Sequence, residues 1–314
     1  MRFQVAGEMH DQEYAFATGR IRGMENQLLD AARFRRLIEV SLEEAVKIIA
    51  EAGYKKESQD TDVSDVNSVI NLHVRRTYEQ VRGFVPDPAL VDLFTLKYEV
   101  ALLKSDLRRR WISKKEIALF IPEWLKHRQA ELLARESLGP QAADIALDKI
   151  MYEEAALSAR SSGSDMLIRL FDAFAIASNL LTLLRGRMRQ MAPEQVLSAL
   201  VPSTVDTPVY RAALKAGWEE IPGLFSATFA YRPLALNMEN VVRDRSFESL
   251  ERDLDNAILV IAREGKRVTM GPEAVAGFLV GKEFEAKNLR IIFAGKADGH
   301  KPETIRGRLR DSYA

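Results

Sequence analysis

Residues 179–200, NLLTLLRGRMRQMAPEQVLSAL, match residues 288–309, NLRIIFAGKADGHKPETIRGRL, at a constant separation of 109 positions and without a gap. Each stretch begins with an Asn-Leu pair, continues with apolar residues at helical spacing, and then has a glycine followed by a cation. A Pro-Glu pair follows in both stretches. A match at a fixed separation indicates an internal repeat, so the chain contains at least two copies of one helical unit.

Both copies of the repeat predict a long helix, a short loop and a second helix. The glycine and the cation are expected to stop the long helix, and proline is favoured in the first turn of the next helix. These residues are Gly186, Arg187 and Pro193 in one copy and Gly295, Lys296 and Pro302 in the other. Repetition of this kind is typical of similar packing modules placed side by side.

Asn179 and Asn288 occupy equivalent positions in the repeat and have apolar neighbours at helical spacing. A buried amide must find hydrogen-bond partners, so we expect each side chain to bond to a neighbouring backbone segment. Binding of a ligand is the alternative for both residues.

The remainder of the chain also favours helices, which makes the predicted fold class all-α. Apolar residues from Tyr14 to Ile49 recur with helical periodicity, and we find no convincing ladder of strands. The first helix is expected to end near Asp30, and Gly53 is expected to adopt a left-handed C-terminal cap. The helix predicted over residues 273–296 is apolar on more than one side, so it should be buried.

Turn-forming residues divide the chain into three predicted modules. Residues 55–68 are polar and predict a loop, and further breaks are expected at Pro86 and Pro88, at Gly139 and Pro140, and between Val201 and Pro233. A weaker third copy of the repeat is KYEVALLKSDLRRRW, residues 97–111. The predicted modules are residues 1–115, 116–205 and 206–314.

The composition excludes several classes of function. The 314 residues carry 45 Lys plus Arg and 45 Asp plus Glu, and this balance argues against nucleic acid as a partner. The absence of cysteine excludes thiolate catalysis and Cys-ligated metals. The N-terminal residues lack a secretory pattern, so an intracellular protein is expected. The apolar window over residues 166–184 contains charged residues, so it predicts a buried helix and not a membrane span.

Enzyme signatures are absent or poor in the sequence. Gly265-Lys266 and Gly281-Lys282 resemble the end of a phosphate loop, but Arg and Glu follow where Ser or Thr is required. Asp144 and Asp148 lie one helical turn apart, and surface ion pairing explains them. The four histidines are scattered singly, without metal-ligand spacing, and are expected to be solvated: His10, His73, His127 and His300. We therefore expect no catalytic residue, no cofactor and no metal.

Three parts of the chain resemble a known family. The closing residues 271–314 contain KEFEAKNLRIIFAGK followed by ETIRGRL, the middle contains DIALDKIMYEEAAL and FDAFAIASNLLTLLRGRM, and the opening contains YAFATGRIRGMENQLL. These stretches are similar to the C subunit of V-type and A-type ATP synthases, which is related to the d subunit of the eukaryotic V-ATPase. The resemblance is weakest over residues 55–87 and 203–232, and KYEVALLKS replaces the Asn-Leu pair in the first module.

The resemblance implies a fold and a function. The fold would be an all-helical funnel of three similar modules with pseudo-threefold symmetry. The protein would be a non-catalytic adapter between the central stalk (D and F type subunits) and the membrane proteolipid ring. It would transmit torque for ATP-coupled proton or sodium transport, and it would lie peripherally at the cytoplasmic face of the cell membrane. A helical-repeat scaffold that binds other soluble proteins is the alternative that the repeat alone supports.

Basic residues at predicted helix ends are the candidate contact residues of such an adapter. Arginines cluster at residues 33–36, 108–110 and 185–189. Cations at a helix C-terminus are also favoured by its exposed carbonyls, so stabilisation of the helix end is the competing explanation. The candidates for partner contact are Arg185, Arg187, Arg290 and Lys296.

Overall fold

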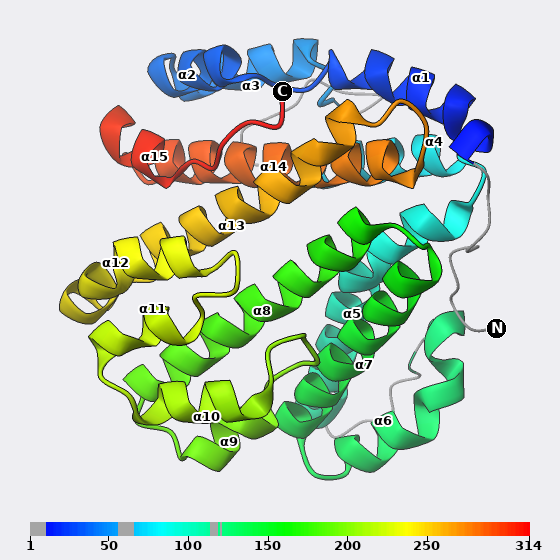
Figure 1. Ribbon diagram of the computed structural model, residues 1–314. Helices are drawn as coiled ribbons and strands as arrows, with labels where there is room; N and C mark the ends of the chain where they lie inside the picture. Colours follow the sequence, from blue (N-terminus) through cyan, green and yellow to red (C-terminus); the bar gives the residue numbers. More distant parts are fainter. Residues whose placement is uncertain (1–10, 56–65, 114–118, 120) are drawn as a thin grey trace. The chain divides into compact units, whose positions relative to one another are not determined.

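A computed structural model describes residues 11–55, 66–113, 119 and 121–314 of the chain. These residues form helices joined by turns and loops, with no strand among them, which confirms the all-α prediction (Figure 1). Contacts between Cα atoms group the described residues into two compact units. Unit 1 contains residues 89–228, and unit 2 contains residues 11–88 together with residues 229–314. The division into three modules stays a prediction.

Unit 1 is built around the helix α8 (Asp165–Met188), which packs against α7, α9 and α10. Over one window α8 has a mean hydropathy of 1.7, so by length and composition it is long and apolar enough to cross a membrane. Its buried residues include Leu170, Asn179 and Leu184, as the sequence predicted for a core helix. The other helices are α5 (Pro88–Ser113), η3 (Glu123–Arg128), α6 (Gln129–Glu136), α7 (Pro140–Ser161), α9 (Pro193–Ser198), α10 (Thr207–Lys215), η4 (Trp218–Glu220) and α11 (Ile221–Leu224).

Unit 2 is built around the helix α14 (Pro272–Ala297), which contacts helices from both ends of the chain. The sequence predicted burial of this helix on more than one side, and its buried residues confirm the prediction. The surrounding helices are η1 (Asp11–Tyr14), α1 (Ala15–Glu25), α2 (Ala31–Glu39), α3 (Leu42–Glu51), α4 (Val66–Arg82), α12 (Tyr231–Asp244), α13 (Glu248–Arg263), η5 (Glu264–Arg267) and α15 (Pro302–Arg308).

Helix boundaries near the N-terminus differ in part from the prediction. The first helix ends at Glu25, because the Asp30 carboxylate accepts the backbone N–H of Arg33 at 2.8 Å and caps the start of α2 instead. Gly53 follows α3 with φ of 95°, as predicted. Most of the loop predicted over residues 55–68 lies outside the described residues, and its last three residues begin α4.

The predicted proline breaks coincide with helix starts. Pro88 and Pro140 are the first residues of α5 and α7, where the missing N–H of proline removes no helical hydrogen bond. Between Val201 and Pro233 the chain forms only short helices before α12 begins. The breaks at these positions are therefore confirmed.

Candidate functional site: the ends of the two long helices

Asn179 on α8 and Asn288 on α14 each bind a later backbone segment through two hydrogen bonds, an arrangement we call the asparagine clamp. Asn179 Nδ2 donates to the carbonyl of Val201 at 2.8 Å, and its Oδ1 accepts the N–H of the same residue at 2.7 Å. Asn288 makes the same pair with Arg310, both at 2.9 Å. In each case 22 residues separate the partners. The prediction of a buried amide bonded to backbone is confirmed.

The two long helices also end with the same backbone geometry. Gln190 and Gly299, at equivalent positions of the repeat, are left-handed with φ of 56° and 71°. The N–H of the next residue donates to the carbonyl of Gly186 at 2.9 Å in one copy and of Gly295 at 2.8 Å in the other. This is the Schellman motif. Both helices extend two residues past the glycine, so the expectation that the glycine stops the helix is wrong.

The repeated glycine instead allows a close approach of the second helix. A Cβ atom on Gly186 would lie 2.5 Å from a methyl carbon of Val196 on α9. On Gly295 it would lie 2.7 Å from a side-chain carbon of Ile305 on α15. Both distances are shorter than atoms tolerate, so each glycine is required for packing and not for termination of the helix.

The cation that follows each glycine caps the C-terminus of another helix. Arg187 reaches the end of α10, and its guanidinium also lies 4.2 Å from the ring centroid of Trp218. Lys296 reaches the end of α2. Arg187 donates to the carbonyls of Ala213 at 2.8 Å and Ala216 at 2.5 Å. Lys296 donates to the carbonyls of Ile38 at 2.7 Å and of Val40. A cation here satisfies carbonyls that have no partner within their own helix.

The structure distributes the four predicted contact residues over two units. Arg187 and Lys296 serve as helix caps, and desolvation lowers the pKa of both side chains from their ordinary values. Arg185 is exposed in the last turn of α8. Arg290 donates to the side-chain oxygen of Asn71 on α4 at 2.7 Å. Contact of any of them with a partner stays a prediction.

Replacement of Gln190 by glycine is expected to stabilise the protein. A side chain with Cβ in the left-handed region costs about 1 kcal/mol or more, and the other copy already has glycine at this position. Gln190→Gly should therefore raise the free energy of unfolding by about 0.5–1 kcal/mol in urea titrations. The control Arg189→Gly, one residue earlier at φ of −87°, should lower it. Destabilisation by Gln190→Gly would contradict this interpretation.

A buried ion pair in α14 is a feature that the sequence patterns did not predict. The Lys282 ammonium lies 2.5 Å from the Glu285 carboxylate, and the two side chains are 6% and 3% exposed. Glu285 also accepts the backbone N–H of Leu29 at 2.5 Å and the hydroxyl of Tyr54. Removing one partner of such a pair leaves a buried charge and costs about 3–5 kcal/mol. The pair thus connects α14 to the segments around α2 and α3.

His73 packs beside this ion pair and is not the solvated residue that the sequence predicted. Its ring stacks on Tyr54 with centroids 3.9 Å apart, and Nδ1 lies 3.0 Å from the carbonyl oxygen of Gly53. Burial, with a smaller effect from the Lys282 charge, lowers the pKa of His73 to about 4. The physical reason for the wrong prediction is that the turn after α3 folds back onto α4.

The other histidines behave differently from His73. His127 and His300 are both exposed, as predicted, and His127 Nε2 lies 3.2 Å from the carboxylate of Glu154. His10 lies outside the described residues. In the part of the chain that the structure describes, no three His, Asp or Glu side chains are placed to hold a metal ion.

Acidification is expected to destabilise the protein through His73. The unfolded chain carries histidine with its ordinary pKa of 6.5, whereas the folded value is about 4. Between these values the unfolded state binds the extra proton, so the free energy of unfolding falls as the pH drops from 6.5 to 4. Urea titrations across this range should give a shallower decline for His73→Phe, which keeps a stacking ring. Equal pH slopes for the two proteins would refute the assignment.

The carboxylates on α7 are paired with cations on α5. Asp148 lies 2.5 Å from Lys104, and Asp144 pairs with Arg108. The ion pairing that the sequence predicted for both residues is confirmed. The two arginines that follow Arg108 have different partners: Arg109 pairs with Asp106, and Arg110 lies 3.5 Å from Glu136.

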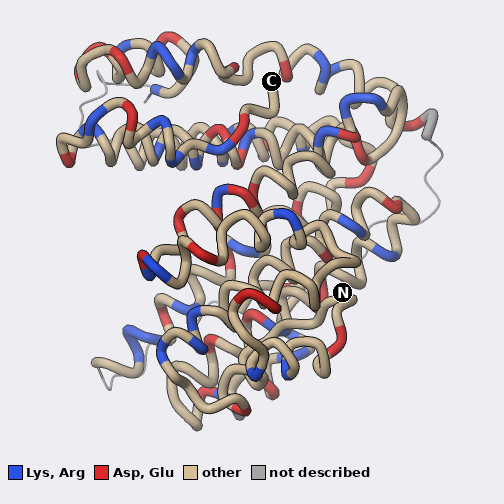
Figure 2. The backbone as a smooth tube through the Cα atoms, turned by 60° about the vertical axis from the view of Figure 1, so that its left-hand side comes forward, with Lys and Arg blue, Asp and Glu red and all other residues tan. Residues whose placement is uncertain are grey.

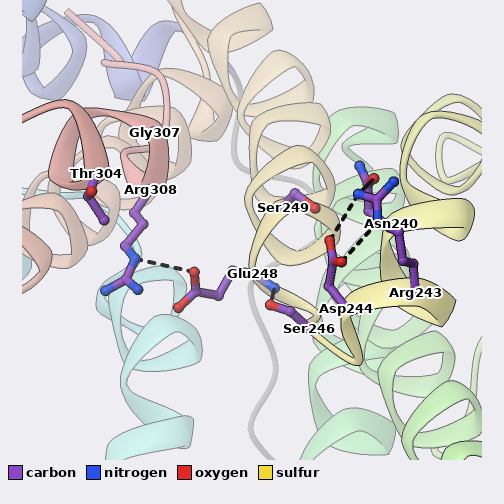
Figure 3. A pocket seen from close by; sticks show the side chains of 9 residues that line it. All are labelled: Asn240, Arg243, Asp244, Ser246, Glu248, Ser249, Thr304, Gly307 and Arg308. Carbon is purple, nitrogen blue, oxygen red and sulfur yellow. Dashed lines mark hydrogen bonds and ion pairs between the residues drawn. The ribbon is translucent and has the colours of Figure 1, made fainter.

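A polar cavity of about 360 Å³ lies between α15 and the corner joining α12 to α13 (Figure 3). Its two arginines are both engaged: Arg308 lies 3.2 Å from Glu248, and Arg243 lies 2.9 Å from Asp244. The guanidinium of Arg243 holds the pKa of Asp244 below its usual value. Each of these two arginines is therefore neutralised by a carboxylate of the cavity wall.

Charges of both signs are interspersed along the helices of each unit (Figure 2). This distribution agrees with the formal net charge of zero.

Comparison with known proteins identifies the family. The family described as ATP synthase (C/AC39) subunit matches residues 17–137 and 109–308. The chain belongs to this family. The resemblance predicted from the sequence is therefore confirmed.

Members of the family cover nearly the whole chain. The C subunit of the A-type ATP synthase of Methanocaldococcus jannaschii is 24% identical over 94% of this chain and 86% of its own length. The C subunit of the V-type sodium ATPase of Enterococcus hirae is 20% identical over 96% of this chain and 99% of its own length. The C subunit of the A-type ATP synthase of Methanosarcina mazei is 23% identical over 94% of this chain and 92% of its own length. The relatives are thus C subunits of A-type and V-type enzymes, and they align with nearly the whole of this chain.

Proposed function

We propose that this chain is the central-axis adapter of a rotary V/A-type ATPase. In this role it links the central stalk, made of D and F type subunits, to the membrane proteolipid ring. It transmits torque for ATP-coupled transport of protons or sodium ions. The observation that carries the proposal is the family match over residues 17–308, with relatives that align along 86% or more of their own length.

The geometry of the helix ends supports a mechanical role. Torque transmission requires a part that deforms little under load, and close packing of helices supplies low compressibility. In each unit the asparagine clamp, the glycine contact and the cation cap attach the long helix to three different segments. A twist applied at one of these segments therefore reaches the long helix directly.

The proposed adapter has no catalytic chemistry of its own. The carboxylates Asp144 and Asp148 are neutralised by cations on α5, and Glu285 is neutralised by Lys282. The protein would associate with the cytoplasmic face of the membrane through its protein partners. Within it, residues 1–115, 116–205 and 206–314 would form three modules, with Arg185 and Arg290 as partner contacts.

Native mass spectrometry tests this proposal. The tagged chain is purified from gently solubilised membranes, with an unrelated tagged soluble protein as control. We expect one copy per complex together with central-stalk and proteolipid subunits. Arg185→Glu and Arg290→Glu should reduce the retained fraction about tenfold, a change of ~1.4 kcal/mol in affinity, whereas Arg189→Glu should not.

Recovery of the chain only from the soluble fraction would contradict the adapter. A stable soluble complex without membrane subunits would instead favour the helical scaffold that the repeat alone supports. Wild-type retention of both charge-reversal variants would remove Arg185 and Arg290 from the proposed contacts and leave the adapter in place.

A further inference from the structure

The asparagine clamps fix which residues of the two units are equivalent beyond the helix ends. Thr204 lies three residues after Val201, and Tyr313 lies three residues after Arg310. On the long helices, Asp172 and Gly281 each lie seven residues before the clamping asparagine. Unit 2 therefore shows what can occupy the corresponding place in unit 1.

In unit 2 the chain fills a groove beside α14 with its own aromatic residue. Tyr313 is 3% exposed, and a Cβ atom on Gly281 would lie 2.5 Å from its ring. The Tyr313 carbonyl accepts from Lys266 Nζ at 2.8 Å, and its hydroxyl lies 3.2 Å from the Glu25 carboxylate. The segment that delivers this ring, residues 309–314, is not helical. An extended segment with one aromatic anchor thus closes the groove in unit 2.

Among the described residues of unit 1, none fills the equivalent groove with an aromatic ring. Thr204 occupies the position of Tyr313, and its N–H and hydroxyl bind the Asp172 carboxylate at 2.7 and 2.5 Å. A cavity of about 370 Å³ lies there between α7, α8 and residues 202–204. Its volume falls in the range of sites that accept small ligands or large side chains.

The walls of the open groove are mainly apolar. They include Ala156 on α7 and Ile168, Phe171 and Ala175 on α8. Leu157 at the rim is 52% exposed and extends the apolar wall to the surface. Three charged residues, Glu153, Arg160 and Asp172, also line the cavity, and Asp172 is bonded to Thr204. The apolar part of the wall can pack against a ring, and the polar part lies beside it.

We propose that this groove, lined by α7, α8 and residues 202–204 of unit 1, binds an extended segment of another subunit that inserts an aromatic side chain. The inference rests on the proposed function, because the partner is a subunit of the same complex. It follows from the repeat: the same groove in unit 2 is closed by an extended segment carrying Tyr313. Tyr and Trp are also enriched among the residues that contribute most to binding at protein interfaces.

Two variants block the groove in different ways. The double variant Asp172→Gly/Thr204→Tyr supplies both the ring and the glycine that unit 2 carries at these positions, and Leu157→Glu places a charge at the apolar rim. The matched control is Leu236→Glu on α12, where the leucine is 62% exposed and lies outside the groove. Circular dichroism and thermal unfolding verify that each protein is folded, and Asp172→Gly/Thr204→Tyr keeps the test valid if Leu157→Glu does not fold.

The measurement is the fraction of each full-length variant that co-purifies with the other subunits of the solubilised complex in competition with wild type. The co-purifying fraction of both groove variants should fall about tenfold relative to wild type, which corresponds to ~1.4 kcal/mol in affinity. The co-purifying fraction of Leu236→Glu should equal that of wild type. Wild-type retention of either folded groove variant would overturn the proposal. That result would leave the adapter role intact, whereas failure of wild type to enter any complex would refute the adapter role itself.

Cross-linking identifies the occupant independently. Benzoylphenylalanine at Leu157 of the full chain is irradiated in intact membranes, and the linked peptides are sequenced. The proposal predicts linkage to an aromatic-containing segment of another protein that co-purifies with the complex. Linkage to lipid, to a second copy of this chain or to this chain itself would contradict it, as would the same peptide captured from Leu236.

Discussion

The asparagine clamp is the interaction on which the rest of the structure depends. A buried amide left without partners costs about 1–3 kcal/mol, so the fold must bring a backbone segment with both a free donor and a free acceptor to each asparagine. In both units the segment lies 22 residues downstream. The short helix between them is thereby held against the long helix, which explains why a glycine is needed where the two approach.

The other repeated contacts extend this arrangement outward. Arg187 and Lys296 use the same position of the repeat to cap helices that differ in sequence and in place along the chain. In unit 2 the buried pair of Lys282 and Glu285 adds further attachments to the N-terminal helices. Each long helix is thus fixed at several levels along its length, which is the property expected of a part that transmits force.

The sequence predicted those features that depend on local patterns. Helical periodicity indicated the long helices, and the repeat indicated the register of the clamps. Neither pattern identifies the acceptors of Arg187 and Lys296, which lie 26 and 258 residues away. Burial of Lys282 with Glu285 was also out of reach, because two opposite charges one turn apart normally indicate a solvated helix face. Gln190 was missed because glutamine has no preference for positive φ.

Native-state hydrogen exchange of the backbone amides of Val201 and Arg310 tests the central role of the clamps most directly. Both amides lie outside any helix, yet each donates to a buried asparagine. We predict that they exchange as slowly as the amides in the middle of α8 and α14, because only global unfolding of the unit opens the clamp. Exchange at the rate of an unprotected loop amide would contradict the account.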